Sequence, residues 1–266
     1  MKSIKALSKI SLVIIVSTLF TFGLSAQEFS FPLNNAKKLV IDKMQSDITI
    51  KGHNSTELII TTDDHDSYEK PKKAEGLRSL YNTKEDNTGI GLAIIEVDGI
   101  IKIEPATRSS EDSEYTIFIP KNLTLKIDYS SPFAEDVIVK DLTGEVEIKT
   151  LNGDIDLINI TGPTAISSIN GDINCIFSEV NQEAPISISS VNGELDITIP
   201  VNTKANFVLS TFSGDIFTDI DLEFDKKSKE GLSIIGGNKI KGKFNGGGVE
   251  ILLNTINDNI YLRKAK

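Results

Sequence analysis

The chain has 266 residues and a formal net charge of −10 at pH 7, from 38 acidic and 28 basic side chains. Because nucleic-acid binding rests on Lys and Arg that neutralise phosphates, this balance argues against a nucleic-acid partner, and equally against electrostatic docking on anionic lipid. The single cysteine excludes an intrachain disulfide, so burial and hydrogen bonds must hold the fold together.

The first 26 residues have the pattern of a secretory signal peptide. Three lysines precede a mostly apolar run over residues 10–24, which is short for a membrane span, and small residues follow at Ser25 and Ala26. We predict a signal peptide over residues 1–26, cleaved after Ala26, and no membrane span in the mature chain. The alternative is an uncleaved N-terminal anchor helix. Export would take the protein to the periplasm, the cell surface or the medium.

Short alternating runs of apolar and polar residues begin at Lys37, as in residues 39–42 and 47–51, and turn residues separate them. This spacing is typical of strands in an all-β sandwich, barrel or solenoid. We interpret residues 27–36 as a lead-in and residues 37–266 as a single domain.

Residues 63–91 interrupt this pattern with a charged stretch that predicts a long surface loop, with one helical turn near residues 74–80. Such a loop inside a domain is functional or mobile. Its acidic start could coordinate a metal, but a short acidic run in a polar loop is more simply explained as solvated. That run is Asp63, Asp64, His65 and Asp66.

A nine-residue period follows, marked by Gly144, Gly153, Gly162 and Gly171. Counted from each glycine, positions +2, +4 and often +7 are apolar, whereas +1 and +3 are polar. Since strand side chains alternate between faces, one set should point inward and the other outward. We expect each glycine at a bend with positive φ. Two units would make one coil of a β-solenoid, whose stacked coils share a core.

The spacing then lengthens to Gly193 and Gly214, with the extra residues near 181–185 and 200–204. Those segments should lie at the corner opposite the Asn-Gly turns. Two degenerate copies complete the set: residues 254–260, with Asp258 in the glycine place, and residues 44–48, with Ser46 there.

A second geometry is possible, because Asn-Gly between alternating strands is also a strong hairpin signal and would give an antiparallel meander or sandwich. The near-verbatim recurrence of the phrase favours the solenoid. In that fold Asn152, Asn170 and Asn192 would stack into a ladder of amide hydrogen bonds.

The recurring phrase Ser/Thr-x-Asn/Ser-Gly-Asp-Ile resembles the bacterial putative-adhesin family, a β-strand-repeat domain of undetermined function in exported proteins. Residues 115–125 and 197–205 share its order of strand, Ile-Pro and polar turn. The resemblance spans roughly residues 37–262. It implies an all-β, solenoid-like fold and an exported location, and it brings no catalytic residues.

Several side chains are candidates for metal binding. The outward acids Asp154, Asp172, Glu194 and Asp215 could form a file that a divalent cation bridges, but acids after Asn-Gly also suit a solvated turn, and no EF-hand loop is present. His53 falls in a turn and Cys175 at an inward position. We therefore predict no metal and no cofactor.

Catalysis has little support. The paired serines at 167–168 and 189–190 show no partner base, and no nucleophile elbow or phosphate-binding glycine loop occurs. Asp154 and Asp156 could act as an acid–base pair on a glycan, but the chain has no Trp and only five Tyr to form a sugar platform. We predict no catalytic residues.

The sequence thus indicates a non-catalytic, exported, adhesin-like β-repeat module. It would present an acidic strand face to an unknown envelope or extracellular protein or glycan, with specific contacts most expected from the 63–91 loop. The alternatives are an envelope regulatory or scaffold component and, less favoured, a glycan-active enzyme. The oligomeric state stays open.

Overall fold

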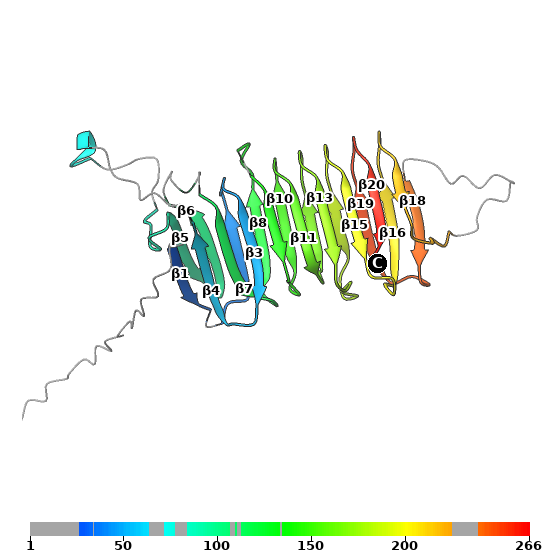
Figure 1. Ribbon diagram of the computed structural model, residues 1–266, viewed down its shortest axis with the longest axis horizontal. Coiled ribbons are helices and arrows are strands. Elements are labelled where there is room, and N and C mark those ends of the chain that lie inside the picture. Colours follow the sequence, from blue (N-terminus) through cyan, green and yellow to red (C-terminus); the bar gives the residue numbers. More distant parts are fainter. Residues whose placement is uncertain are drawn as a thin grey trace, which may run out of the picture.

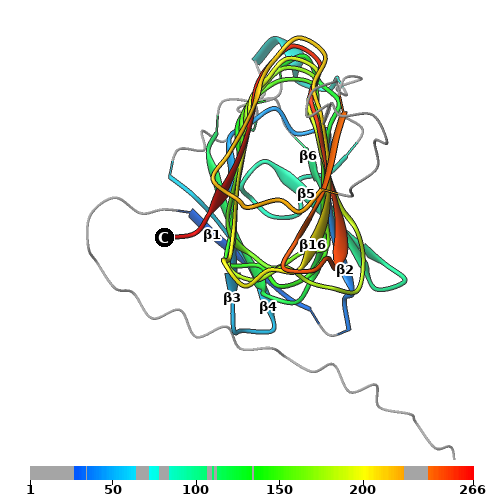
Figure 2. The same ribbon diagram turned by 90° about the vertical axis from the view of Figure 1, so that its right-hand side faces the viewer.

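The computed structural model describes residues 27–33, 35–63, 72–77, 84–106, 110, 113–133, 135–224 and 239–266. These residues form 20 β-strands and one 3-10 turn at Lys72–Ala74, within the predicted long loop. The strands build two ten-stranded sheets. Figure 1 shows them side by side along the long axis, and Figure 2, down that axis, shows the coils superposed with the sheets as two facing walls. The predicted all-β solenoid is confirmed.

Sheet A contains ten strands, each hydrogen-bonded to the next in the following order. They are β1 (Gln27–Pro32), β4 (Glu57–Thr62), β7 (Tyr115–Pro120), β3 (Ile48–His53), β9 (Val137–Lys140), β11 (Ile155–Ile160), β13 (Ile173–Phe177), β15 (Leu195–Ile199), β20 (Ile260–Lys264) and β17 (Ile216–Thr218).

Sheet B, in spatial order from the same end, contains the other ten. They are β5 (Leu92–Val97), β6 (Ile100–Pro105), β2 (Lys38–Asp42), β8 (Thr124–Tyr129), β10 (Val146–Thr150), β12 (Thr164–Ser167), β14 (Ile186–Ser189), β19 (Val249–Asn254), β16 (Ala205–Ser210) and β18 (Lys239–Phe244).

The central strands pair in parallel. In sheet A, β11 lies between β9 and β13, and in sheet B, β10 lies between β8 and β12. Consecutive strands such as β10 and β11 lie in opposite sheets, so the Asn-Gly turns connect the two walls instead of closing hairpins. The antiparallel meander is therefore wrong. In the described residues, antiparallel pairing between strands occurs only near the two ends, in β1–β4, β4–β7, β5–β6 and β16–β18.

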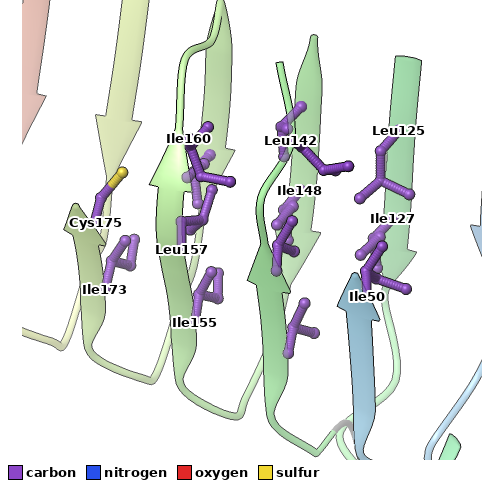
Figure 3. Packing of buried hydrophobic residues seen from close by; sticks show 14 of the residues in the cluster. Ile50, Leu125, Ile127, Leu142, Ile148, Ile155, Leu157, Ile160, Ile173 and Cys175 are labelled. Carbon is purple, nitrogen blue, oxygen red and sulfur yellow. The ribbon is translucent and has the colours of Figure 1, made fainter. Parts of the chain in front are cut away.

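The core is a continuous aliphatic layer between the sheets. Ile155, Ile173 and Leu195 are cross-strand neighbours and have no exposed surface. Figure 3 shows such side chains from both walls meeting, and Cys175 lies among them. Burial of each Ile or Leu contributes about 1.5–3 kcal/mol, so every added coil extends one stabilising seam.

Glycine recurs at the corners because the backbones of successive coils touch there. A Cβ on Gly193 would lie 2.0 Å from the carbonyl oxygen of Gly171, and one on Gly171 would lie 2.1 Å from that of Gly153. Positive φ is not the shared cause that we expected: Gly153 has φ of 85°, whereas Gly144 and Gly193 lie outside that region. Close stacking selects the glycine.

The predicted inward set needs one correction at position +7. Leu151 is half-buried and Ile169 is 41% exposed, whereas Ile160 is buried. Leu151 and Ile169 lie in the corner, where the chain leaves the sheet and the two-residue alternation stops. They join an outward column of apolar side chains that also contains Val191, Ile256 and Phe212.

The spatial order of the coils departs from the chain order at both ends. Strands β19 and β20 lie between the coil β14–β15 and the coil β16–β17, which Figure 1 shows as red strands among yellow ones. Strands β2 and β3 lie in the same way between β6–β7 and β8–β9. The two degenerate copies are thus true coils, and their register places Asp258 and Ser46 in the glycine position.

Residues 27–32, expected as a lead-in, form strand β1 at the edge of sheet A. The predicted signal peptide lies outside the described residues. In the part of the chain that the structure describes, no helix has the length and apolar character to cross a membrane.

Candidate functional site: a stacked polar corner

The predicted asparagine ladder is present at the corner where sheet B passes into sheet A. Asn170 Nδ2 donates to Asn152 Oδ1 at 2.9 Å, and Asn192 Nδ2 donates to Asn170 Oδ1 at 2.8 Å. Asn257, from the inserted last coil, continues the ladder by donating to Asn192. Each amide in the middle of the ladder therefore donates to one neighbouring coil and accepts from the other.

A column of carboxylates runs beside the ladder, formed by the residue directly before each of five neighbouring sheet-A strands, β3, β9, β11, β13 and β15. Asp154 Oδ1 accepts the backbone N–H of Asp172 at 2.8 Å, and Asp172 Oδ1 accepts that of Glu194 at 2.8 Å. Asp136 and Asp47 extend the same pattern, with distances of 2.7 and 2.9 Å. We define the acidic column as Asp47, Asp136, Asp154, Asp172 and Glu194.

Two members of this column, Asp47 and Asp136, were not predicted from the sequence. The signal that could have found them is their place immediately before the strand residues Ile48 and Val137. Asp215, which was predicted to join the column, lies two coils beyond Glu194, because the coil of β20 stands between them. Its own N–H donates to Asn259 Oδ1, so an amide separates Asp215 from Glu194 in the stack.

Stacking like charges is tolerable in this column because the hydrogen bonds outweigh the repulsion. Two unit charges at the strand spacing of about 4.8 Å repel by about 0.9 kcal/mol in water. A hydrogen bond to a charged group contributes about 1.5–3 kcal/mol. Each aspartate in the column uses Oδ1 for its neighbouring coil, and all four are exposed. The column therefore joins successive coils by hydrogen bonds and at the same time forms a linear array of negative charge.

At the C-terminal end, sheet A carries a denser network on its outer face. Glu194 Oε1 accepts from Tyr261 Oη and from Asn259 Nδ2, both at 3.1 Å. Arg263 donates two hydrogen bonds to Asp196, from Nε to Oδ1 at 2.7 Å and from Nη2 to Oδ2 at 2.9 Å. Its guanidinium lies 5.3 Å from the centre of the Tyr261 ring. These contacts join β15 to the inserted β20.

The candidate acid–base pair is engaged in stacking. Asp154 accepts from the Asp172 backbone, and Asp156 Oδ1 accepts from Asn174 Nδ2 at 3.0 Å. The two carboxylates serve the next coil instead of facing a common substrate position.

The other candidates are structural. Burial raises the pKa of the Cys175 thiol well above its usual value, so the thiol stays protonated in the core. His53 Nε2 lies 2.8 Å from the carbonyl oxygen of Glu57 across a turn. Ser168 and Ser190 are buried behind the ladder.

The predicted acidic metal run begins at Asp63, which lines a small cavity of about 80 Å³ with Asp47 and Glu114. Residues 64–66 lie outside the described residues. Among the described residues, no group of three or more His, Cys, Asp or Glu could hold a metal ion.

The end of the 63–91 loop is fixed onto sheet B. Asp86 accepts N–H bonds from Thr88, Gly89 and Gly91 at 2.8–3.0 Å. Burial opposes ionisation of this carboxyl, but the hydrogen bonds together lower its pKa. Lys84 contacts Glu104, which is almost fully buried.

Comparison with known proteins agrees with this architecture. The family model named Toastrack DUF4097 matches residues 134–262. This stretch, just under half of the chain, is therefore similar to the Toastrack DUF4097 family. The match covers the regular coils, the ladder and most of the acidic column, and the resemblance to adhesin-like β-repeat proteins is confirmed there. A search of curated proteins found no match.

A solved structure also resembles this chain in fold. A putative cell adhesion protein from Clostridium sporogenes aligns with a TM-score of 0.50 and 11% identity, over 91% of this chain and 100% of that one. A putative adhesin from Bacteroides fragilis aligns with a TM-score of 0.32 and 8% identity, over 91% and 97%. At such low identity, the clostridial structure supports the fold alone.

Proposed function

We propose that this protein is a non-catalytic, exported, adhesin-like module whose acidic column binds a basic partner in the cell envelope or outside the cell. The observation that carries the proposal is the regular stacking of Asp47, Asp136, Asp154, Asp172 and Glu194 along one corner. A rigid row of charges with a constant spacing favours a partner that carries a matching row of cationic groups.

Two further features support a binding role. The column stands beside an outward apolar column in which Ile169, Ile256 and Phe212 are 41%, 41% and 73% exposed. Charged and apolar side chains thus run in parallel along the same corner. The adhesion name of the clostridial structure is consistent with such a role, and the signal-like residues 1–26 are consistent with export.

The test uses the chain from residue 27 onward and immobilised envelope material, with bound protein measured against salt concentration. A triple variant, Asp136→Asn, Asp154→Asn and Asp172→Asn, keeps the side-chain acceptors but removes three charges. It should bind several-fold more weakly at low salt, and the difference should shrink once the Debye length falls well below about 8 Å.

The matched control removes three exposed acids outside the column: Glu96→Gln, Glu183→Gln and Glu250→Gln. This control should bind like the wild type. If both triple variants bind equally weakly, the loss of binding comes from net charge and not from the column, and the proposal is overturned. Unchanged binding by the column variant would also overturn it.

A further inference from the structure

We propose that the opposite corner, where sheet A passes into sheet B, holds a separate binding site for a saccharide unit. A cavity of about 400 Å³ lies between the turn after β13 and the turn after β15. Its lining residues are Ser178, Glu179, Val180, Gln182, Pro200, Asn202, Thr203 and Lys204. This volume falls within the range of ligand pockets, about 300–1,000 Å³.

The cavity exists because of the inserted strand β19. In sheet A, β15 lies directly beside β13. In sheet B, the strand that follows β15 in the chain, β16, does not lie beside β14, because β19 occupies that place. The turn over residues 200–204 therefore slants away from the turn over residues 178–185. The two insertions that the sequence showed at these positions form the two walls.

The walls are held by hydrogen bonds from the segment that enters β19. Gln182 Oε1 accepts the N–H of Val249 at 3.2 Å, and its Nε2 donates to the carbonyl of Val180 at 3.0 Å. Asn245 Nδ2 donates to the carbonyls of Val201 and Thr203 at 3.0 and 2.8 Å. Three segments distant in sequence thus fix one hollow, so little ordering is needed on binding.

A glycine lets these segments meet. A Cβ on Gly248 would lie 2.3 Å from the carbonyl oxygen of Lys204 and 2.6 Å from Gln182 Oε1. No other residue allows the β19 entry to lie against both walls. The hollow is therefore a built feature of the coil insertion and not a gap between loose turns.

The free polar groups in the cavity define the ligand. Glu179, Asn202 and Lys204 are exposed, and none makes a side-chain hydrogen bond or ion pair with the described residues. The carboxylate and the ammonium line the same hollow without pairing with each other. A carboxylate accepts from a hydroxyl, an ammonium donates to one, and an amide does both.

Vicinal hydroxyls of a sugar ring satisfy such a set without adding net charge. Val180 is 6% exposed and lines the cavity with Pro200, which gives the C–H face of a sugar ring an apolar surface. This site is independent of the acidic column, which runs along the other corner, and it uses no aromatic platform.

The experiment is an amide-resolved NMR titration of the chain from residue 27 with two probes, the trisaccharide of N-acetylglucosamine and maltotriose. We expect saturable shifts for at least one probe, confined to residues 178–182 and 200–204, with a Kd on the order of 1 mM. Glu179→Gln and Lys204→Met should each raise that Kd by about tenfold, which corresponds to one lost charged hydrogen bond. Glu183→Gln, an exposed acid in the same turn, should leave it unchanged.

Three results would overturn the proposal. They are no saturable shift with either sugar, a wild-type Kd in both the Glu179 and the Lys204 variant, or saturation by glycylglycine in place of the sugars, which would mark a site for zwitterions. Unchanged spectra elsewhere show that the variants are folded. Envelope binding that persists in the Glu179 and Lys204 variants would leave the role of the acidic column standing.

Discussion

Asn170 and Asn192, which are 22 residues apart in the sequence, lie one above the other, with Asn192 Nδ2 donating to Asn170 Oδ1 at 2.8 Å. Asn170 in turn donates to Asn152 at 2.9 Å. A side chain in the middle of the ladder therefore serves two coils at once.

Replacing Asn170 by alanine should lower the free energy of unfolding by about 1–2 kcal/mol, because two amide hydrogen bonds are lost. Urea unfolding followed by circular dichroism measures this. Asn202→Ala is the control, since that amide bonds to none of the described residues, and it should stay within about 0.5 kcal/mol of the wild type. Equal effects would show that the ladder adds nothing to stability.

The acidic column predicts a difference between two substitutions at Asp172. Asp172→Asn keeps an oxygen that accepts the Glu194 N–H and removes a repulsive charge, so stability should change by less than about 0.5 kcal/mol. Asp172→Ala removes the acceptor and should cost about 1–2 kcal/mol. Thermal unfolding of both variants in the same buffer compares them. A larger loss in the asparagine variant would contradict the assigned hydrogen bond.

Gly193 tests the contact between coils. Gly193→Ala should destabilise the protein by about 3 kcal/mol or more, because the new Cβ meets a backbone oxygen that no rotamer change can move aside. Gly246→Ala separates this effect from backbone strain, since Gly246 has φ of 80° with nothing near its Cβ, and about 1–2 kcal/mol is expected there. Denaturant midpoints rank the two, and the reverse order would refute close stacking.

Tyr115 predicts loss of stability at high pH. Burial raises the pKa of its phenol to about 12, and the hydroxyl donates to the carbonyl of Ile90 at 2.8 Å. In the unfolded chain this pKa is about 10, so the unfolded state releases its proton first. Stability is complete below pH ~10 and falls as the pH rises towards 12.

Unfolding free energies at a series of alkaline pH values, with tyrosinate absorbance as the second signal, check this expectation. Tyr115→Phe should show a shallower decline with pH than the wild type. An unchanged slope in this variant would assign the alkaline loss to other groups.

Cys175 reports opening of the core. Its thiol has no exposed surface, and burial raises its pKa, so little thiolate forms in the native state. We expect Ellman's reagent to label the native protein only as fast as it unfolds, and to label it at once in denaturant. Fast labelling in native buffer would place the thiol outside the core seam.

The strand repeat could be predicted well because the pattern of each coil is local. Ile155 and Leu157 alternate with Asp154 and Asp156, and this pattern alone assigns inside and outside. The prediction failed at Ile169, where a corner ends the alternation. It also failed at the cause of the recurring glycines such as Gly193, since a contact between two coils is invisible in either one.

The candidate sites, like the fold, could be predicted only in part from the sequence. The phrase around Asn170 was enough to predict the ladder, because identical side chains in stacked coils must meet. The cavity beside Glu179 and Lys204 could not be predicted, since its walls are fixed by Asn245, which is more than 40 residues away in the chain from the turn it binds.

By itself the sequence determined the element type, the length of a coil and which side chains face the core, because these follow from periodicities of two and nine residues. Only the tertiary structure decided which coil stacks on which. Every coil offers a similar aliphatic face, so local pattern cannot rank neighbours. The long-range contacts of β2–β3 and β19–β20 decide the order, and that order creates the cavity between the turns that follow β13 and β15.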